Sequence, residues 1–292
     1  MARDDAVPLG LGAALAASAL FNVGIALQAL DARVQPKDHG MRLSLLGRLL
    51  RRRRWVLGFV LGVSGFPLEI LAFAHAPFVM VQALLAAGLV LLLVLGSRML
   101  DERVGVPEVA GVLAIGAGIA LVAWGAPSHS NGHRGQWQVI AVVATLSVLT
   151  FLPFALRGRR WDTALLAIVG SAVAFATGNI ATKLMSDDFN NDHWGGAGAW
   201  LAVVIVTGIA ALVVEMTALQ RSEATVVVPV SFAIQTFLPI ALGPLFLRQQ
   251  LATAELGGAP LVAGILLLLV GTLAVARTRA VTQLVSAGAG PR

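Results

Sequence analysis

The sequence predicts an all-α integral membrane protein of about nine transmembrane helices, built as two inverted four-helix repeats joined by a connector helix. Three observations predict it. The chain of 292 residues is 58% hydrophobic and only 12% charged, whereas a soluble domain is about 25% charged. Nine apolar segments approach the 20 residues or so that a helix needs to cross the hydrocarbon. Residues of the first half recur in the second half in the same order.

The nine predicted spans divide the chain into three regions. They are residues 7–30, 55–74, 78–99, 109–124, 137–156, 164–184, 199–219, 224–247 and 257–276. Residues 1–136 form the first repeat with spans one to four, residues 137–163 hold the connector span, and residues 164–292 form the second repeat. Because MARDDAVPLG carries two aspartates beside one arginine, we interpret the first apolar run as a retained span and not as a signal peptide.

Basic residues predict the orientation of these spans. The loop at 31–54 holds eight Lys and Arg residues, and placing it in the cytoplasm puts 17 of the 21 Lys and Arg residues inside and 4 outside. We therefore expect a multi-pass protein of the plasma membrane with its N-terminus outside and its C-terminus in the cytoplasm. The net charge of +6 is then explained by the lipid bilayer as partner, and nucleic acid is not expected. Within this loop, MRLSLLGRLLRRRR at 41–54 predicts a short interfacial helix on anionic lipid.

The internal repeat relates spans one to four to spans six to nine. The matched pairs are Ala19 with Ala174, Ile25 with Ile180, Ala26 with Ala181, Glu69 with Glu215, Glu108 with Glu255 and Gly111 with Gly258. With the connector between the repeats, span one runs inward and span six outward, so the repeats are inverted. Inverted repeats are typical of secondary transporters, in which the two halves rock around one site.

Two acids lie inside the predicted spans, Glu69 and Glu215, one in each repeat. A charge near the middle of the bilayer costs at least about 2.5–3.5 kcal/mol, so such an acid is a functional hypothesis by default. The alternative is a structural acid that hydrogen-bonds a neighbouring helix. Glu69 is also the candidate metal ligand, because its carboxylate and the carbonyls freed by Pro67 are hard oxygen ligands suited to Na⁺, Mg²⁺ or a protonated amine. Burial disfavours the charged carboxylate, so cation binding could exchange with a proton.

Six further polar residues inside the spans are candidates for the substrate or ion pathway: Asn22, Gln28, Gln82, Asn179, Lys183 and Gln235. The alternative for the amides is hydrogen bonding between helices, and Lys183 could extend to the headgroups.

Enzyme signatures are absent from the sequence. The chain has no cysteine, which excludes a thiolate nucleophile and Cys-based metal sites, and it has no phosphate-binding GxxxxGK[ST] run. We therefore expect no enzymatic activity and no cofactor.

The run AHAPFVMVQALLAAGLVLLLVLGSRMLDERVGVPEVAG, with its acidic–Arg turn at 101–103, resembles the drug/metabolite transporter (EamA-like) superfamily. FNVGIALQAL and RRRRWVLGFVLGVSGFPLEILAFAHAP are similar to its branch of NIPA-type magnesium transporters and their bacterial relatives, although Phe66 stands where that branch has Glu and Glu69 where it has Asn. The resemblance covers spans one to four well and the rest loosely. It implies a secondary transporter that moves a small solute or cation by alternating access. The alternatives are a Mg²⁺ or other divalent-cation pathway and a non-transporting membrane scaffold, and a homodimer is left open.

Overall fold

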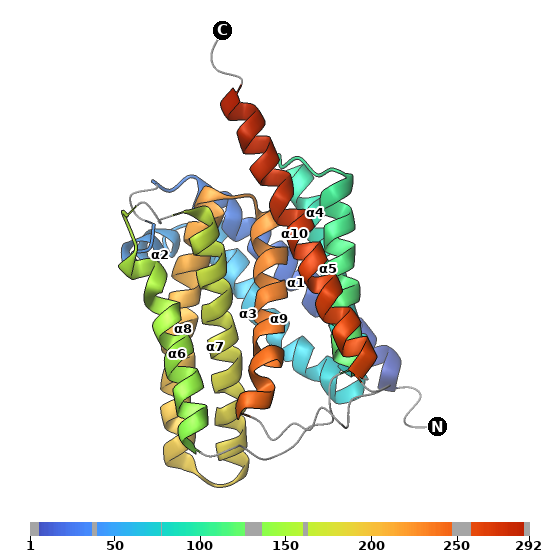
Figure 1. The fold of residues 1–292 in the computed structure, drawn as a ribbon, viewed down its shortest axis with the longest axis vertical. Helices are drawn as coiled ribbons and strands as arrows, with labels where there is room; N and C mark the ends of the chain where they lie inside the picture. Colours follow the sequence, from blue (N-terminus) through green and yellow to red (C-terminus); the bar gives the residue numbers. More distant parts are fainter. Residues whose placement is uncertain are drawn as a thin grey trace.

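The computed structural model describes residues 6–36, 40–76, 78–125, 136–159, 163–246 and 258–288. Within these ranges the chain forms ten α-helices and no strand (Figure 1). They are α1 (Ala6–Arg33), α2 (Leu43–Leu49), α3 (Arg53–His75), α4 (Phe78–Met99), α5 (Val106–Gly125), α6 (Gln136–Ala155), α7 (Ala164–Asn190), α8 (Trp194–Arg221), α9 (Ala224–Phe246) and α10 (Ala259–Gly288). The all-α prediction is confirmed, and α2 lies in the segment where a short helix was expected.

Length and apolar composition make six of the described helices candidate membrane spans: α1, α3, α5, α6, α7 and α8. Helices α4, α9 and α10 also contain apolar stretches, at Ala83–Met99, Ala224–Pro239 and Ala259–Val275, counted over the described side chains alone. The chain is therefore a multi-pass membrane protein that contacts the lipid bilayer, whereas the count of nine spans stays a prediction.

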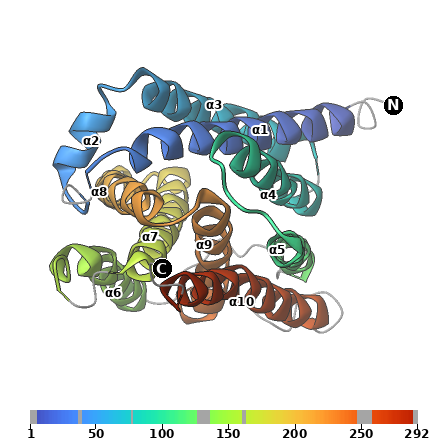
Figure 2. The ribbon, with the colours of Figure 1, turned by 90° about the horizontal axis from the view of Figure 1, so that it is seen from above.

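Three antiparallel helix pairs organise the bundle, α1 with α3, α7 with α8, and α5 with α10 (Figure 2). Helix α1 also packs on α4, and α4 on α5; in the second half α7 packs on α9, and α9 on α10. Helix α6 packs mainly on α7. The pair α5–α10 thus joins the first half of the chain to the second.

Glycines allow α5 to approach α10 closely from Gly111 to Gly125. Seven-residue spacing places Gly111 and Gly118 on one side of α5, opposite Gly271 and Gly264 of α10. A Cβ atom at Gly118 would lie 2.8 Å from the Gly264 carbonyl oxygen and 2.8 Å from the Leu268 amide nitrogen. Since lipid tails are as apolar as the helices themselves, such close backbone packing is a main force that holds helices together in a membrane.

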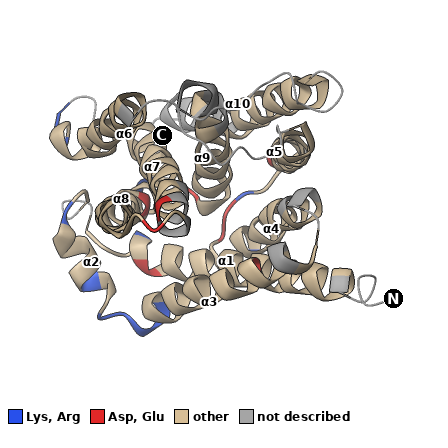
Figure 3. Cartoon of the chain, turned by 90° about the horizontal axis from the view of Figure 1, so that it is seen from below, with Lys and Arg blue, Asp and Glu red and all other residues tan. Residues whose placement is uncertain are grey.

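Basic residues gather at one end of the bundle, most densely along α2 and at its junction with α3 (Figure 3). Every arginine whose side chain the structure describes lies at this end, which we call the basic end. It comprises the C-terminal ends of α1, α4, α6 and α8, the N-terminal ends of α3, α5, α7 and α9, and all of α2. The four basic residues predicted to lie outside, Arg3, Arg134, Lys183 and Arg248, are not among the described side chains, so the orientation across the membrane stays a prediction.

The core is shared by both halves at the basic end and along α5–α10, and it is divided in the rest of the bundle. One cluster includes Leu45 and Trp55 of the first half with Met216 and Leu219 of the second, and it also contains the α5–α10 contact. Farther from the basic end, α1, α3 and α4 have a cluster of their own around Ala72. Helices α6 and α7, with neighbouring side chains of α8 and α9, have another. The two sides of the bundle are therefore joined at the basic end and along α5–α10.

Replacing Gly118 with alanine should destabilise the bundle, because the new methyl group meets backbone atoms of α10 that cannot move aside singly. We expect a loss of about 1–3 kcal/mol, as for other overpacked sites, measured as a lower apparent Tm in detergent. The matched control is Gly116→Ala two residues away, where the nearest atom to the new Cβ is Ala86 Cβ at 3.9 Å. Equal Tm values for the two variants would contradict the role given to the α5–α10 contact.

Candidate functional site

A buried carboxylate at the basic end joins the two halves of the chain. Glu102 lies in the connection between α4 and α5, and its side chain is 1% exposed. Its Oε1 accepts a hydrogen bond from the Ala224 amide at 2.7 Å, and its Oε2 accepts one from the Thr225 amide at 2.9 Å. These are the first two N–H groups of α9, which have no partner within their own helix. A carboxylate there satisfies both donors and interacts favourably with the helix dipole.

Arg33 at the end of α1 completes this contact. Its guanidinium forms an ion pair with Glu102 Oε1 and donates a second hydrogen bond to the Leu100 carbonyl at 3.2 Å. The carboxylate is therefore held by charge from α1 and by backbone donors from α9. Removing either partner would leave a buried charge incompletely paired, which is costly in a low-dielectric interior.

Local backbone geometry directs Glu102 toward α9. Asp101 adopts a left-handed conformation with φ of +52°, which Asp tolerates better than most residues. The Glu102 amide then donates to the Gly96 carbonyl at 3.0 Å. A Cβ at Gly96 would collide with the Thr225 side chain, so the glycine is needed for α4 to approach the start of α9.

A second set of polar contacts joins α1, α3 and α8 nearby. Asp31 of α1 accepts a hydrogen bond from the Trp55 amide at 3.0 Å and so caps the first turn of α3. The Trp55 indole N–H points at Met216 Sδ of α8, 3.1 Å away. The Met41 amide donates to Thr217 Oγ1 at 2.9 Å and attaches the start of the α2 segment to α8. The basic end is thus closed by polar groups at several points.

The two predicted intramembrane acids lie toward opposite ends of the bundle. Glu69 is half-buried and lies six residues before His75, the end of α3; Glu215 is buried and lies six residues before Arg221, the end of α8. Trp55 at the start of α3 contacts Met216, next to Glu215, and 14 residues of helix, about 21 Å, separate Trp55 from Glu69. The structure therefore does not bring the two carboxylates into one site. Neither makes a hydrogen bond or ion pair with a described residue.

The other predicted residues are distributed over several helix contacts. Asn22 is buried where α1 meets α4 at Gly88, and its Nδ2 donates to the Ser18 carbonyl at 2.8 Å. Gln28 is buried beside Gly58 of α3. Gln235 is half-buried and Asn179 is exposed. Gln82 and Lys183 lie outside the described side chains. The role of each in a pathway stays a prediction.

Sequence analysis missed the residues that close the basic end. Glu102, Asp31 and Arg33 lie in predicted loops, and the sequence analysis sought functional residues inside the spans. The first N–H groups of every helix lack a partner within the helix. An acid in a short connection such as that of Glu102 could therefore have been considered as a cap for another helix. The structure also buries polar atoms without a partner among the described residues, namely Gln28 Oε1, Thr225 Oγ1 and both amide atoms of Gln220. All three residues belong to helix turns at or near the basic end.

Within the described residues, no three His, Cys, Asp or Glu side chains come together as a metal-ion site. Comparison with known protein families, with curated proteins and with solved structures found no match to this chain.

Replacing Glu102 with glutamine should weaken the basic end, because the neutral amide loses the Arg33 ion pair and offers one acceptor oxygen to two α9 amides. We expect a loss of about 1.5–3 kcal/mol, the range for hydrogen bonds to charged groups, seen as a lower apparent Tm. Glu108→Gln is the control: its carboxylate accepts only from Gly105 of the same connection, at 2.8 Å. If both variants lost the same stability, Glu102 would have no special part in joining the halves.

Proposed function

We propose that the chain is a secondary transporter that moves a small solute or cation by alternating access, with the fold of the drug/metabolite transporter superfamily. The observation that carries the proposal is the division of the core away from the α5–α10 pair: the other helices of the two sides share a cluster toward the basic end and have separate clusters farther away. A bundle whose two sides, apart from the α5–α10 pair, are joined at one end and divided at the other has the arrangement of one access state. Rocking of the two sides would produce the other state.

The order of helix packing supports two repeats of four spans. Helix α1 packs on α3 and α4, and α4 on α5; helix α7 packs on α8 and α9, and α9 on α10. Helices α1, α3, α4 and α5 thus correspond to α7, α8, α9 and α10, with α6 as the connector. The equal positions of Glu69 and Glu215 before the ends of α3 and α8, toward opposite ends of the bundle, support the inversion. In this proposal all nine long helices cross the membrane, and the basic end faces the cytoplasm.

The Arg33–Glu102–α9 contact serves as the closure on the cytoplasmic side. It is polar, it joins the two halves, and every partner can be satisfied by water once the basic end opens. A closure of this kind is cheaper to break than a large apolar interface. The α5–α10 contact runs from Gly111 with Val275 to Gly125 with Leu261 and would remain intact as the axis of the motion.

Glu69 is the residue proposed to couple cation or proton movement to transport. It lies in the part of the bundle where the two sides have separate cores, and it is only half-buried. Its carboxylate has no partner among the described residues, whereas Glu102 is fully paired. An unpaired intramembrane acid is costly unless a cation, a proton or water reaches it.

Opening of the basic end can be followed with a cysteine at Thr225, because the native chain has no cysteine and Thr225 is fully buried beside the closure. We expect slow modification of Thr225→Cys by a membrane-impermeant thiol reagent from the basic side. Combining it with Glu102→Gln should accelerate modification at least about tenfold, because the closure is weakened. Unchanged rates in the double variant would show that Glu102 does not control access.

Replacing Glu69 with glutamine should abolish gradient-driven uptake while leaving folding intact, because glutamine keeps the shape and cannot titrate. The cargo is first identified by thermal shift of the purified protein against metals, amines, amino acids and nucleosides, since a bound ligand raises the apparent Tm. Uptake of that cargo into liposomes with an imposed pH gradient is then compared with Glu108→Gln. Full gradient-driven uptake by well-folded Glu69→Gln would make Glu69 a structural acid.

A further inference from the structure

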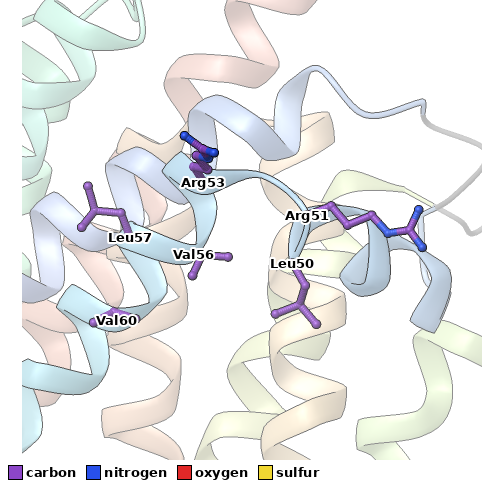
Figure 4. A pocket seen from close by; sticks show the side chains of 6 residues that line it. All are labelled: Leu50, Arg51, Arg53, Val56, Leu57 and Val60. Carbon is purple, nitrogen blue, oxygen red and sulfur yellow. The ribbon is translucent and has the colours of Figure 1, made fainter.

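An open pocket of about 390 Å³ lies at the junction of α2 and α3 (Figure 4). It is lined by Leu50, Arg51, Arg53, Val56, Leu57 and Val60. In the view of Figure 4, Leu50 and Val60 lie below both arginines, and the two guanidinium groups extend away from the apolar side chains. The pocket therefore has an apolar part along α3 and a cationic rim at the basic end.

Among the described residues, no acid forms an ion pair with the arginines of the cationic rim. Arg51, Arg52, Arg53 and Arg54 are all exposed, and none of their side chains pairs with a described residue. Arg52, the N-cap of α3, makes no side-chain cap. Asp31 contacts the start of α3, but its side chain is buried and already accepts a hydrogen bond from the Trp55 amide. An anion at the rim would meet donors that are not otherwise engaged.

The apolar part of the pocket is exposed, whereas the neighbouring helix α2 is anchored to the rest of the bundle. Leu50, Leu57 and Val60 are each just over half exposed, and Leu57 and Val60 belong to the candidate span Arg53–Ala72. On the other side of α2, Leu45 and Leu49 are fully buried in the shared core. The Met41 amide also holds this segment to Thr217 of α8. The pocket is consequently a preformed feature between an anchored helix and the lipid-facing side of α3.

We propose that this pocket binds one anionic phospholipid, with the phosphate at Arg51 and Arg53 and an acyl chain along Leu57 and Val60. A phospholipid carries both parts on one molecule, because its phosphate lies at the membrane surface and its chains extend from there into the hydrocarbon. Basic residues at the membrane surface attract anionic lipid, and the apolar part restricts the occupant to a molecule with a chain. Through α2, the bound lipid would be linked to the closure at the basic end.

The test is native mass spectrometry of the intact detergent-purified protein with phosphatidylglycerol, and with phosphatidylcholine as the zwitterionic comparison. We expect phosphatidylglycerol to bind at least about tenfold more tightly than phosphatidylcholine, and Arg51→Gln/Arg53→Gln to lose that preference. The matched control is Arg42→Gln/Arg48→Gln, which removes the same charge from exposed positions of the α2 segment outside the pocket. It should change binding less than twofold.

A second variant tests the apolar part separately. Leu57→Asn keeps every arginine and should weaken phosphatidylglycerol binding severalfold, while glycerol phosphate, which has no chain, should neither bind nor compete at the same concentration. Equal losses in the two double-arginine variants would indicate general surface attraction and overturn the site. Effective competition by glycerol phosphate, or unchanged binding in Leu57→Asn, would show an anion site without a lipid chain and overturn it as well.

Discussion

The arrangement of the bundle depends on the buried carboxylate of Glu102. It is placed by a left-handed turn at Asp101, and it receives an ion pair from Arg33 of α1 and two amide donors from the start of α9. These partners come from opposite halves of the chain. A charge in a low-dielectric environment is tolerated only when it is fully paired, so the halves must meet at this point for the carboxylate to remain ionised and buried.

Different forces act in the other helix contacts. In α5–α10, glycines such as Gly118 and Gly264 bring the backbones together, and in lipid this packing takes the place of the hydrophobic effect. Such contacts resist separation along their whole length, whereas a polar closure opens once water reaches it. The fold thus combines a close backbone contact with a polar one, the combination on which the proposed rocking mechanism depends.

Composition and segment length were enough to predict an all-helical membrane protein, whereas its orientation across the membrane stays a prediction. The pairing of helices was harder to predict, because Gly111, Gly118 and Gly264 look ordinary in a glycine-rich chain until their partners are known. For the same reason the search for functional acids favoured Glu69 and Glu215, which lie inside apolar runs. Glu102 was passed over because its burial is created by the start of α9, more than 100 residues away in sequence.

In the proposed rocking motion, the two sides of the bundle approach each other at the far end when they separate at the basic end. Spin labels can report this from exposed positions: Val34 and Leu165 at the basic end, and Leu9 and Trp194 at the far end. Pulsed dipolar distance measurements on each pair would be compared with and without Glu102→Gln. The account predicts a longer Val34–Leu165 distance and a shorter Leu9–Trp194 distance in the variant. Unchanged distances, or lengthening at both ends, would contradict it.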